Sequence, residues 1–163
     1  MQEWLVAGAV IEHDGSVLLV QNRRRGGRTD WSPPGGVIEL ADGEAVLDGL
    51  HREVLEETGL SIQRWGALLY SVEAVAPDLG WHMRAEVWSA EVDHTDLATD
   101  DPDGIVVDAS FVDLARCEDH LADSHDWVRE PLLEWLAERF VDPRHYRYRM
   151  EGDTVNNARI VRW

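Results

Sequence analysis

The sequence contains no lysine, one cysteine and few positive charges of any kind. All 15 cationic residues are arginine, against 32 aspartate and glutamate residues, so the formal net charge at pH 7 is −17. Without lysine, the chain cannot use a Schiff-base lysine, a P-loop lysine or a Ser–Lys nucleophile pair. So acidic a chain also lacks the cationic surface that binds phosphate backbones or anionic lipids, and we therefore expect neither nucleic acid nor membrane as a partner.

Disulfides and long apolar runs are also absent. Cys117 has no second cysteine with which to form a disulfide or a zinc site, and the neighbouring Glu118 and Asp119 disfavour its thiolate. We interpret it as a small buried residue. No apolar run approaches the roughly 18 residues that a membrane-spanning helix requires. The N-terminal segment has no basic leader, and the expected location is the cytoplasm.

The remaining composition is typical of one globular domain. The 163 residues are 44% hydrophobic and 29% charged, and no repeat or linker divides them, so we predict a single domain over residues 1–163. Residues 145–163 follow the last predicted helix and are expected to be a C-terminal extension of the core. Their aromatic and aliphatic side chains need burial, and we expect a second subunit of a homodimer to provide it.

The hydrophobic pattern predicts a mixed α/β fold. Short β-favouring runs at residues 6–11 and 17–20 flank a turn at 13–15 and predict a β-hairpin. Further strands are expected over residues 61–75, 82–92 and 105–112, with an acidic loop over 94–104, and a last hairpin is expected around Gly152.

Three helices complete the predicted set. The first covers residues 43–58, with Asp42 as its N-cap and Gly59 just after its last turn. A second is expected over residues 114–122. The third covers residues 131–140, with Pro131 in its first turn.

The first predicted helix carries three acids on one side. With about 100° between residues, Glu56 lies near 300° and Glu57 near 40° when Glu53 is placed at 0°. The apolar residues of the helix lie beside this arc, at about 20° to 120°. A solvated acidic face, the usual alternative, would instead lie opposite the apolar side. Carboxylates at the apolar margin repel one another unless a cation joins them, and oxygen ligands of this kind suit Mg²⁺ or Mn²⁺.

The spacing around these acids resembles the signature of the Nudix hydrolases, G-x5-E-x7-R-E-U-x-E-E-x-G-U, in which U is aliphatic. Glu44, a gap of seven residues, and the segment Arg52-Glu53-Val54-Leu55-Glu56-Glu57-Thr58-Gly59-Leu60 match it without exception. One departure is that seven residues, not five, separate Gly36 from Glu44. We expect the two extra residues within 40–42, in the loop before the helix, where they leave the helix register unchanged.

The resemblance implies a Nudix-like α/β/α sandwich with a mixed β-sheet. It implies hydrolysis of a diphosphate bond in a nucleotide, either a nucleoside triphosphate or a nucleoside diphosphate linked to another group, as in ADP-ribose. The Mg²⁺ or Mn²⁺ cofactor would be held by Glu53, Glu56, Glu57 and the Gly36 carbonyl. The implied catalytic group is Glu53, Arg52 and Glu44, with Glu53 positioning or deprotonating the attacking water.

Substrate contacts are expected outside this signature, at Arg23, Arg25, Trp31 and Asp103. The two arginines follow the second predicted strand, where similar proteins contact phosphates, and Trp31 or Trp81 is a candidate to stack on a base. Asp103, with Asp101, is a candidate for a general base outside the helix. The alternatives are a solvated basic loop, a core tryptophan and solvated loop acids.

Two other functions remain open. The chain can be a catalytically silent nucleotide-binding or regulatory relative of the family, or a structural acidic domain that binds no metal. Nucleotide turnover distinguishes the first from an enzyme, and metal binding distinguishes the second.

Overall fold

The structure is a computed structural model that describes residues 1–154 and 157–163. Its main sheet has the strand order β10-β9-β6-β7-β1-β5. The strands are β1 (Gln2–Val10), β5 (Gly35–Val37), β6 (Ile62–Ala76), β7 (Trp81–Val92), β9 (Arg144–Glu151) and β10 (Arg159–Arg162). The β1–β7 and β6–β9 pairs are parallel and the other pairs are antiparallel, so the sheet is mixed.

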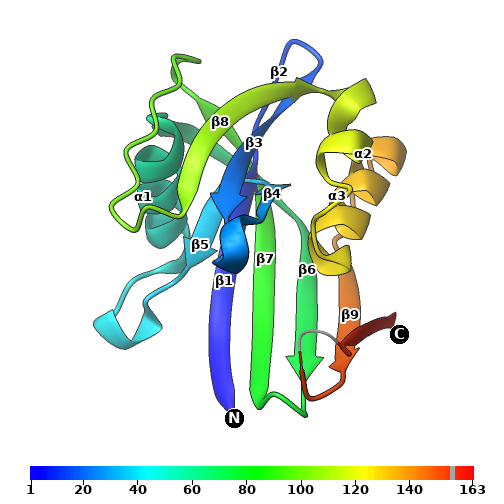
Figure 1. Cartoon of the computed structure of the whole chain (residues 1–163). Helices are drawn as coiled ribbons and strands as arrows, with labels where there is room; N and C mark the ends of the chain where they lie inside the picture. Colours follow the sequence, from blue (N-terminus) through cyan, green and yellow to red (C-terminus); the bar gives the residue numbers. More distant parts are fainter. Residues whose placement is uncertain (155–156) are drawn as a thin grey trace.

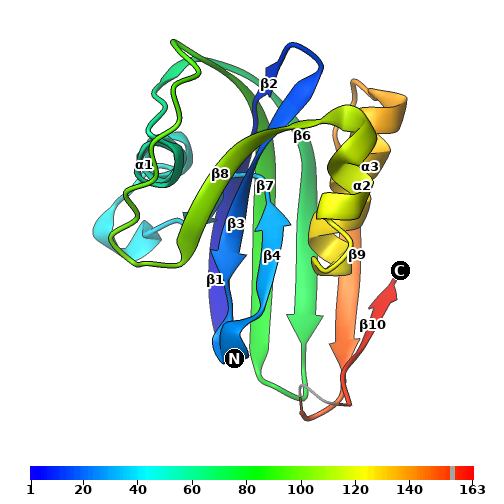
Figure 2. The same ribbon diagram turned by 45° about the horizontal axis from the view of Figure 1, so that its top comes forward.

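A second, smaller sheet is built around β3 (Ser16–Arg23). This strand pairs antiparallel with β2 (Glu12–His13), with β4 (Thr29–Ser32) and with β8 (Val106–Asp113). Figure 2 shows β3 and β4 in front of the main sheet, in the space between the helices.

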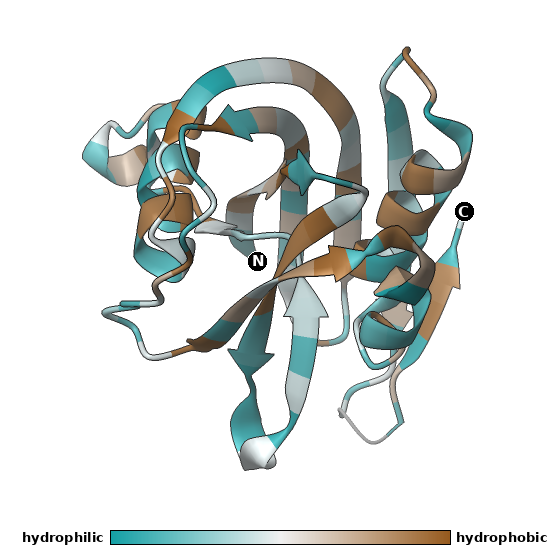
Figure 3. Cartoon of the chain, turned by 90° about the horizontal axis from the view of Figure 1, so that it is seen from above, coloured by the Kyte–Doolittle hydropathy of each residue, from teal (hydrophilic) through white to brown (hydrophobic). Residues whose placement is uncertain are grey.

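Helices cover both faces of the main sheet. Helix α1 (Val46–Thr58) lies on one side, and α2 (Cys117–His120) and α3 (Asp126–Glu138) lie on the other (Figure 1). Buried Leu50 and Val54 of α1 belong to one hydrophobic core, and Leu132 and Trp135 of α3 belong to a second. The peripheral loops are mostly hydrophilic (Figure 3). The predicted α/β/α sandwich with a mixed sheet is therefore confirmed.

The predicted hairpin of residues 6–11 with 17–20 is wrong. Residues 6–10 belong to β1, which pairs with β7 and β5, whereas residues 17–20 belong to β3 in the other sheet. The chain diverges after Ile11, whose carbonyl accepts a 2.9 Å hydrogen bond from the Leu18 N–H, and only the short strand β2 forms a hairpin with β3. Both runs are apolar because each is buried in its own sheet.

Two helix starts also differ from the prediction. Helix α1 begins at Val46 after Ala45, while Asp42 lies in an exposed 3₁₀ turn over Leu40–Asp42. Helix α3 begins at Asp126, so Pro131 lies inside the helix. Proline there leaves the carbonyl four residues earlier without its helical donor, and Pro131 is itself buried. The C-terminal end of α1 is confirmed, with Gly59 in the left-handed conformation at φ 75°.

The C-terminal residues extend the main sheet as β9 and β10. Tyr146 and Tyr148 are buried against the chain's own sheet and α3, and the Tyr148 hydroxyl donates a 2.9 Å hydrogen bond to Glu130. The aromatic residues that suggested a homodimer are thus largely buried within one chain, and the dimer stays a prediction. Residues 155 and 156, next to the turn predicted at Gly152, lie outside the described part of the chain. None of the described helices has the length and apolar character needed to cross a membrane.

Candidate functional site

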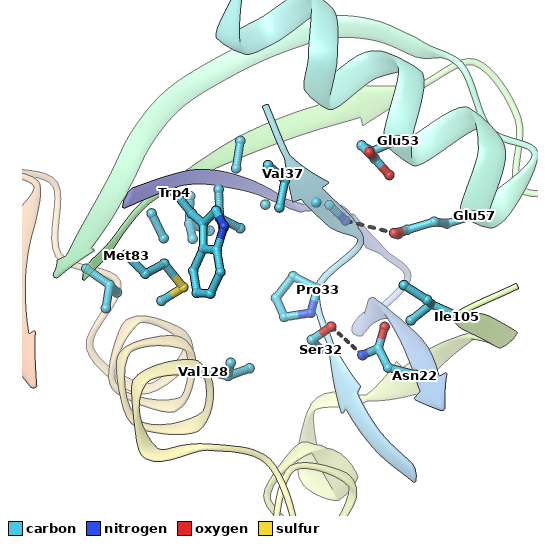
Figure 4. Close-up of a pocket in the computed structure, with 18 of the residues that line it drawn as sticks. Trp4, Asn22, Ser32, Pro33, Val37, Glu53, Glu57, Met83, Ile105 and Val128 are labelled. Carbon is cyan, nitrogen blue, oxygen red and sulfur yellow. Dashed lines mark hydrogen bonds between the residues drawn. The ribbon is translucent and has the colours of Figure 1, made fainter. Parts of the chain in front are cut away.

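A cavity of about 720 Å³ lies between the main sheet, α1 and α3. One wall carries the acids of α1 and of the loop before β8. Another carries aromatic and aliphatic side chains of β1, β7 and α3 (Figure 4). The lining includes Trp4, Asn22, Arg24, Gly36, Glu53, Glu57, Trp81, Met83, Asp101, Asp103, Trp127 and Val128. Cavities of this size hold drug-sized ligands, and a nucleotide has that size.

Two acidic side chains of α1 point into this cavity. The apolar side of α1 packs against the sheet, so the residues at the margin of that side point toward the end of β5. Glu53 and Glu57 are therefore only 9% and 5% exposed, and both line the cavity (Figure 4). The helical arrangement expected from the sequence, with these acids beside the apolar side, agrees with this burial.

Two glycines allow β5 to approach these carboxylates. The Gly35 N–H donates a 3.0 Å hydrogen bond to Glu57 Oε2, and a Cβ at Gly35 would overlap the Ala7 carbonyl. A Cβ at Gly36 would lie 2.7 Å from the carboxyl carbon of Glu53. Any side chain at position 36 would therefore displace Glu53, so the glycine pair maintains the contact between strand and helix.

Burial in this arrangement shifts the pKa values of both cavity acids upward. Burial raises the pKa of Glu53 to about 7, although the neighbouring Arg52 partly opposes this. Burial also raises the pKa of Glu57 to about 9, against the hydrogen bond from Gly35. Two buried carboxyl groups whose negative charge is not compensated are the setting in which a bound cation stabilises the ionised forms.

Arg52 connects Glu44, in the loop before α1, with Glu53 and Glu56 of the helix. Its Nε and Nη2 donate to the two carboxylate oxygens of Glu44 at 3.0 and 3.2 Å. Its Nη1 lies 3.2 Å from Glu53 Oε1 and 3.4 Å from Glu56 Oε2. Glu44 also accepts a hydrogen bond from the Glu39 N–H at 3.1 Å. Arg52 thus ties the loop before α1 to the helix and orients Glu53.

The expected metal ligands are only partly assembled. Within residues 1–154 and 157–163, no group of three His, Cys, Asp or Glu side chains is placed to hold an ion. Glu53 and Glu57 face the cavity beside Gly36, whereas Glu56 is engaged with Arg52. Buried carboxylates with raised pKa values and oxygen-only donors fit Mg²⁺ or Mn²⁺. The two cavity acids and the Gly36 carbonyl therefore fit such an ion.

The arginines expected to bind substrate are placed differently from one another. Arg23 and Arg25 are exposed and do not line the cavity, while Arg24 does. The Arg24 guanidinium donates to both carboxylate oxygens of Asp30, at 2.9 and 3.1 Å. Three consecutive arginines look equivalent in the sequence, and only the register of β3 and the following turn decides which one faces inward.

Trp31 likewise lies outside the main cavity. It borders a smaller hollow and packs edge-on against His120, with ring centroids 5.2 Å apart. The main cavity is lined instead by Trp4, Trp81 and Trp127. Of the two candidates for base stacking, Trp81 therefore lines the cavity and Trp31 does not.

The acidic loop before β8 is bound to the end of α1. The Ala98 N–H donates to the Thr58 carbonyl at 2.9 Å, and the Asp100 N–H donates to the Glu56 carbonyl at 3.0 Å. Asp101 accepts hydrogen bonds from the backbone N–H groups of Asp103 and Ile105 and from that of Val106 at the start of β8, so it holds the turn together. Asp103 lines the cavity, and its charge contributes to the raised pKa of Glu53.

An aromatic group on α3 has no signal in the sequence. His125 stacks on Trp127 with ring centroids 4.3 Å apart, and Trp127 contacts Trp81 edge-on at 6.0 Å. Burial holds the pKa of His125 below its usual value, so the ring is neutral at physiological pH. These residues line the cavity opposite α1, where the helix begins five residues earlier than the sequence predicted.

Comparison with known proteins identifies one family. The family model described as the NUDIX domain matches residues 3–136. A MutT-like protein of Streptomyces ambofaciens is 43% identical over a segment covering 36% of this chain and 34% of that relative. The chain thus aligns with about a third of this curated relative's length.

Two further matches extend over most of the chain. An ADP-ribose pyrophosphatase of Methanocaldococcus jannaschii is 29% identical over 77% of this chain and 70% of the relative. The solved structure of a NUDIX hydrolase from Nitrosomonas europaea superimposes with a TM-score of 0.67 at 26% identity, covering 83% of this chain and 90% of that one.

Proposed function

Because the chain belongs to the Nudix hydrolase family, we propose that it hydrolyses a diphosphate bond in a nucleotide, with Mg²⁺ or Mn²⁺ as its cofactor. The substrate is a nucleoside triphosphate or a nucleoside diphosphate linked to another group, such as ADP-ribose. One observation carries the proposal: two buried carboxyl groups of α1 face a nucleotide-sized cavity beside the glycine pair of β5.

In this proposal the acids of α1 hold the ion at one end of the cavity. Glu53, Glu56, Glu57 and the Gly36 carbonyl supply oxygen ligands, of which Glu53 and Glu57 already face the cavity. The bound ion would supply positive charge that offsets the charge of the diphosphate during hydrolysis. Because the chain's net charge is −17, a polyphosphate needs such local compensation to enter this acidic end.

The protein groups then position substrate and water. Glu53 orients the attacking water and accepts its proton, and Arg52, through its contacts with Glu44 and Glu53, acts as a positioning residue. Asp103 is the second candidate for the proton acceptor, since it lines the same cavity. Trp81 and Trp127 supply an apolar wall against which a base packs, and Arg24 supplies a positive group at the cavity wall.

The experiment is a substrate panel. Purified protein is incubated with nucleoside triphosphates, nucleotide sugars, ADP-ribose and dinucleoside polyphosphates, each with Mg²⁺, with Mn²⁺ and with EDTA. We expect metal-dependent turnover of at least one class. At a metal concentration that saturates each variant, so that the loss of Glu53 as a ligand is offset, Glu53→Gln should lose more activity than Asp103→Asn if Glu53 accepts the proton, and the reverse order would assign that role to Asp103.

A catalytically silent relative gives a different result in the same panel. It would bind nucleotides, as observed by calorimetry, without turning over any of them. Absence of both metal binding and nucleotide binding would instead support the structural acidic domain.

A further inference from the structure

The side chain of Asn22 has its amide group held in one orientation. This residue lies on β3 and is 6% exposed. Its Nδ2 donates to Asp30 Oδ1 at 3.1 Å and to Ser32 Oγ at 2.9 Å. An amide nitrogen carries two hydrogens, and both are used by these two partners.

The opposite orientation of the amide is unfavourable because of Asp30. An ionised carboxylate can only accept hydrogen bonds, so the Asn22 oxygen cannot take the place of its nitrogen beside Asp30 without repulsion. Asp30 is itself 6% exposed and is held by two hydrogen bonds from Arg24. Asp30 is therefore a positioning residue that determines which atom of Asn22 remains available.

The available atom is an acceptor in the cavity wall. No described residue donates a hydrogen bond to Asn22 Oδ1, although Asn22 lines the cavity. Figure 4 shows the oxygen pointing toward Ile105, with Ser32 beside the amide nitrogen. This oxygen is accessible from the cavity, so a ligand that donates an N–H group at this point can form a hydrogen bond with it.

The neighbouring walls suit a flat ring. Trp81, Met83 and Trp127 line the same cavity, and the polar atoms closest to Asn22 are engaged with one another. A nucleobase offers both a face for aromatic contacts and an edge with N–H donors. Phosphates, which carry acceptors only, cannot satisfy Asn22 Oδ1.

We propose that Asn22 is a specificity-determining residue whose Oδ1 accepts a hydrogen bond from the exocyclic amino group of the substrate's nucleobase. The inference rests on the proposed function, since it places the base of the nucleotide in this cavity. Asp30 acts through Asn22, by keeping the amide nitrogen turned away from the base.

The test measures binding of nucleoside monophosphates, which contain no diphosphate bond to hydrolyse. Calorimetry compares AMP with purine riboside 5′-monophosphate, CMP with 2-pyrimidinone riboside 5′-monophosphate, and GMP with IMP. In each pair the second compound lacks the amino group. We expect at least one amino-bearing nucleotide to bind about ten-fold tighter than its partner, which is the effect of one hydrogen bond to a mostly buried group. Equal affinities within every pair, or no binding of any monophosphate, would overturn the proposal.

Two variants separate recognition from folding. Asn22→Leu keeps the size of the side chain and removes the acceptor, so it should abolish the preference within the pair. Asp30→Asn removes the constraint on the amide, so the preference should shrink while the protein still binds the base. If Asp30→Asn keeps the full preference, Asp30 is not a positioning residue. The wild-type comparison needs no variant, so it decides the proposal even if Asn22→Leu fails to fold.

The result is distinguishable from failure of the proposed function. Amino-group discrimination without any hydrolysis in the substrate panel would leave this inference standing and contradict the hydrolase. Metal-dependent hydrolysis without discrimination would leave the hydrolase standing and contradict the role of Asn22.

Discussion

Glu57 illustrates how burial of a single residue links stability to function. Its carboxyl is 5% exposed, and burial raises its pKa from 4.5 to about 9. The folded protein therefore holds this proton more tightly than the unfolded chain does. The stabilisation is complete below about pH 4.5 and is lost as the pH rises toward 9.

A Glu57→Gln variant should remove this pH dependence in the metal-free protein. In EDTA, we expect the variant to melt about 3–6 °C above wild type at pH 8.5, because about 1–2 kcal/mol of repulsion and desolvation is relieved. At pH 5.5 the difference should largely disappear. Thermal unfolding at both pH values measures the effect, with Glu118→Gln on exposed α2 as the control. A constant offset between Glu57→Gln and wild type at the two pH values would contradict the account.

Gly36 gives a second prediction at this scale. Gly36→Ala places a methyl group 2.7 Å from the carboxyl carbon of Glu53, so the carboxylate must move. We expect activity to fall about 100-fold, the typical effect of a displacement of about 1 Å at a catalytic group. Gly8→Ala is the matched control, because its methyl group meets its nearest neighbour at 3.7 Å in the same cavity wall. Similar activities of the two variants would show that the contact of β5 with Glu53 does not matter.

Helical geometry explains why two of the expected site residues could be placed from the sequence. The positions of Glu53 and Glu57 follow from the angle between residues and from the apolar side of α1. Arg24 and Asn22 do not follow from any local pattern, because the side that each faces depends on the register of β3 with β4 and β8. A cavity residue that is selected by contacts between distant segments leaves no periodic signal.

At the scale of elements, α1 and the acidic loop act together. Two backbone hydrogen bonds join the loop to the last carbonyls of α1, from the N–H groups of Ala98 and Asp100. Those carbonyls have no partners within the helix, so the loop serves as the cap of α1. The same loop carries Asp103 into the cavity.

Ala98→Pro should therefore reduce activity with little loss of stability. Proline removes the N–H that donates to the Thr58 carbonyl, which loosens the loop while α1 remains packed against the sheet. We expect kcat to fall about ten-fold and Tm to fall by about 3 °C, the equivalent of one lost hydrogen bond. Thr99→Pro is the control, since no described group accepts from its N–H. Equal losses in both variants would indicate a general effect of proline in this loop.

The elements themselves were predicted unevenly. The strands β6, β7 and β8 and the end of α1 were expected within about two residues, because apolar runs and Gly59 identify them. The starts of α1 and α3 differ from the predicted starts by three and five residues. Neither helix has a side-chain hydrogen bond at its N-cap, so Asp42 and Pro131 appeared to be better starts than Ala45 and His125.

At the scale of the whole molecule, the net charge of −17 dominates the electrostatics. The arginines form ion pairs across the surface, but the acids outnumber them about two to one. Self-repulsion of this kind destabilises the compact state and is screened by salt.

Salt should consequently stabilise the protein. Raising NaCl from 20 to 300 mM in the presence of EDTA should raise Tm by about 2–4 °C, equivalent to about 1 kcal/mol for a chain of this size. Differential scanning calorimetry at pH 7 measures this. A fall in Tm would mean that the ion pairs contribute more to stability than the repulsion costs.

The Nudix signature around α1 predicted the fold as a whole. It did not predict where the C-terminal strands β9 and β10 lie in the sheet. The tail after residue 144 contains three aromatic residues, Tyr146, Tyr148 and Trp163, and the sequence does not show that β9, which carries the two tyrosines, pairs with β6 of the same chain. Parallel pairing of β9 with β6 joins segments about 75 residues apart, so no local pattern indicates it.

The central claim is that the acids of α1 hold a divalent ion in the cavity. Calorimetric titration of the protein with Mn²⁺, at about 150 mM NaCl to screen non-specific binding, tests it most directly. We predict one defined site in wild type, binding at least about ten-fold weaker in Glu57→Gln, and unchanged binding in Glu118→Gln. A wild-type protein that takes up no Mn²⁺, or a Glu57→Gln variant that binds it as tightly as wild type, would contradict the account.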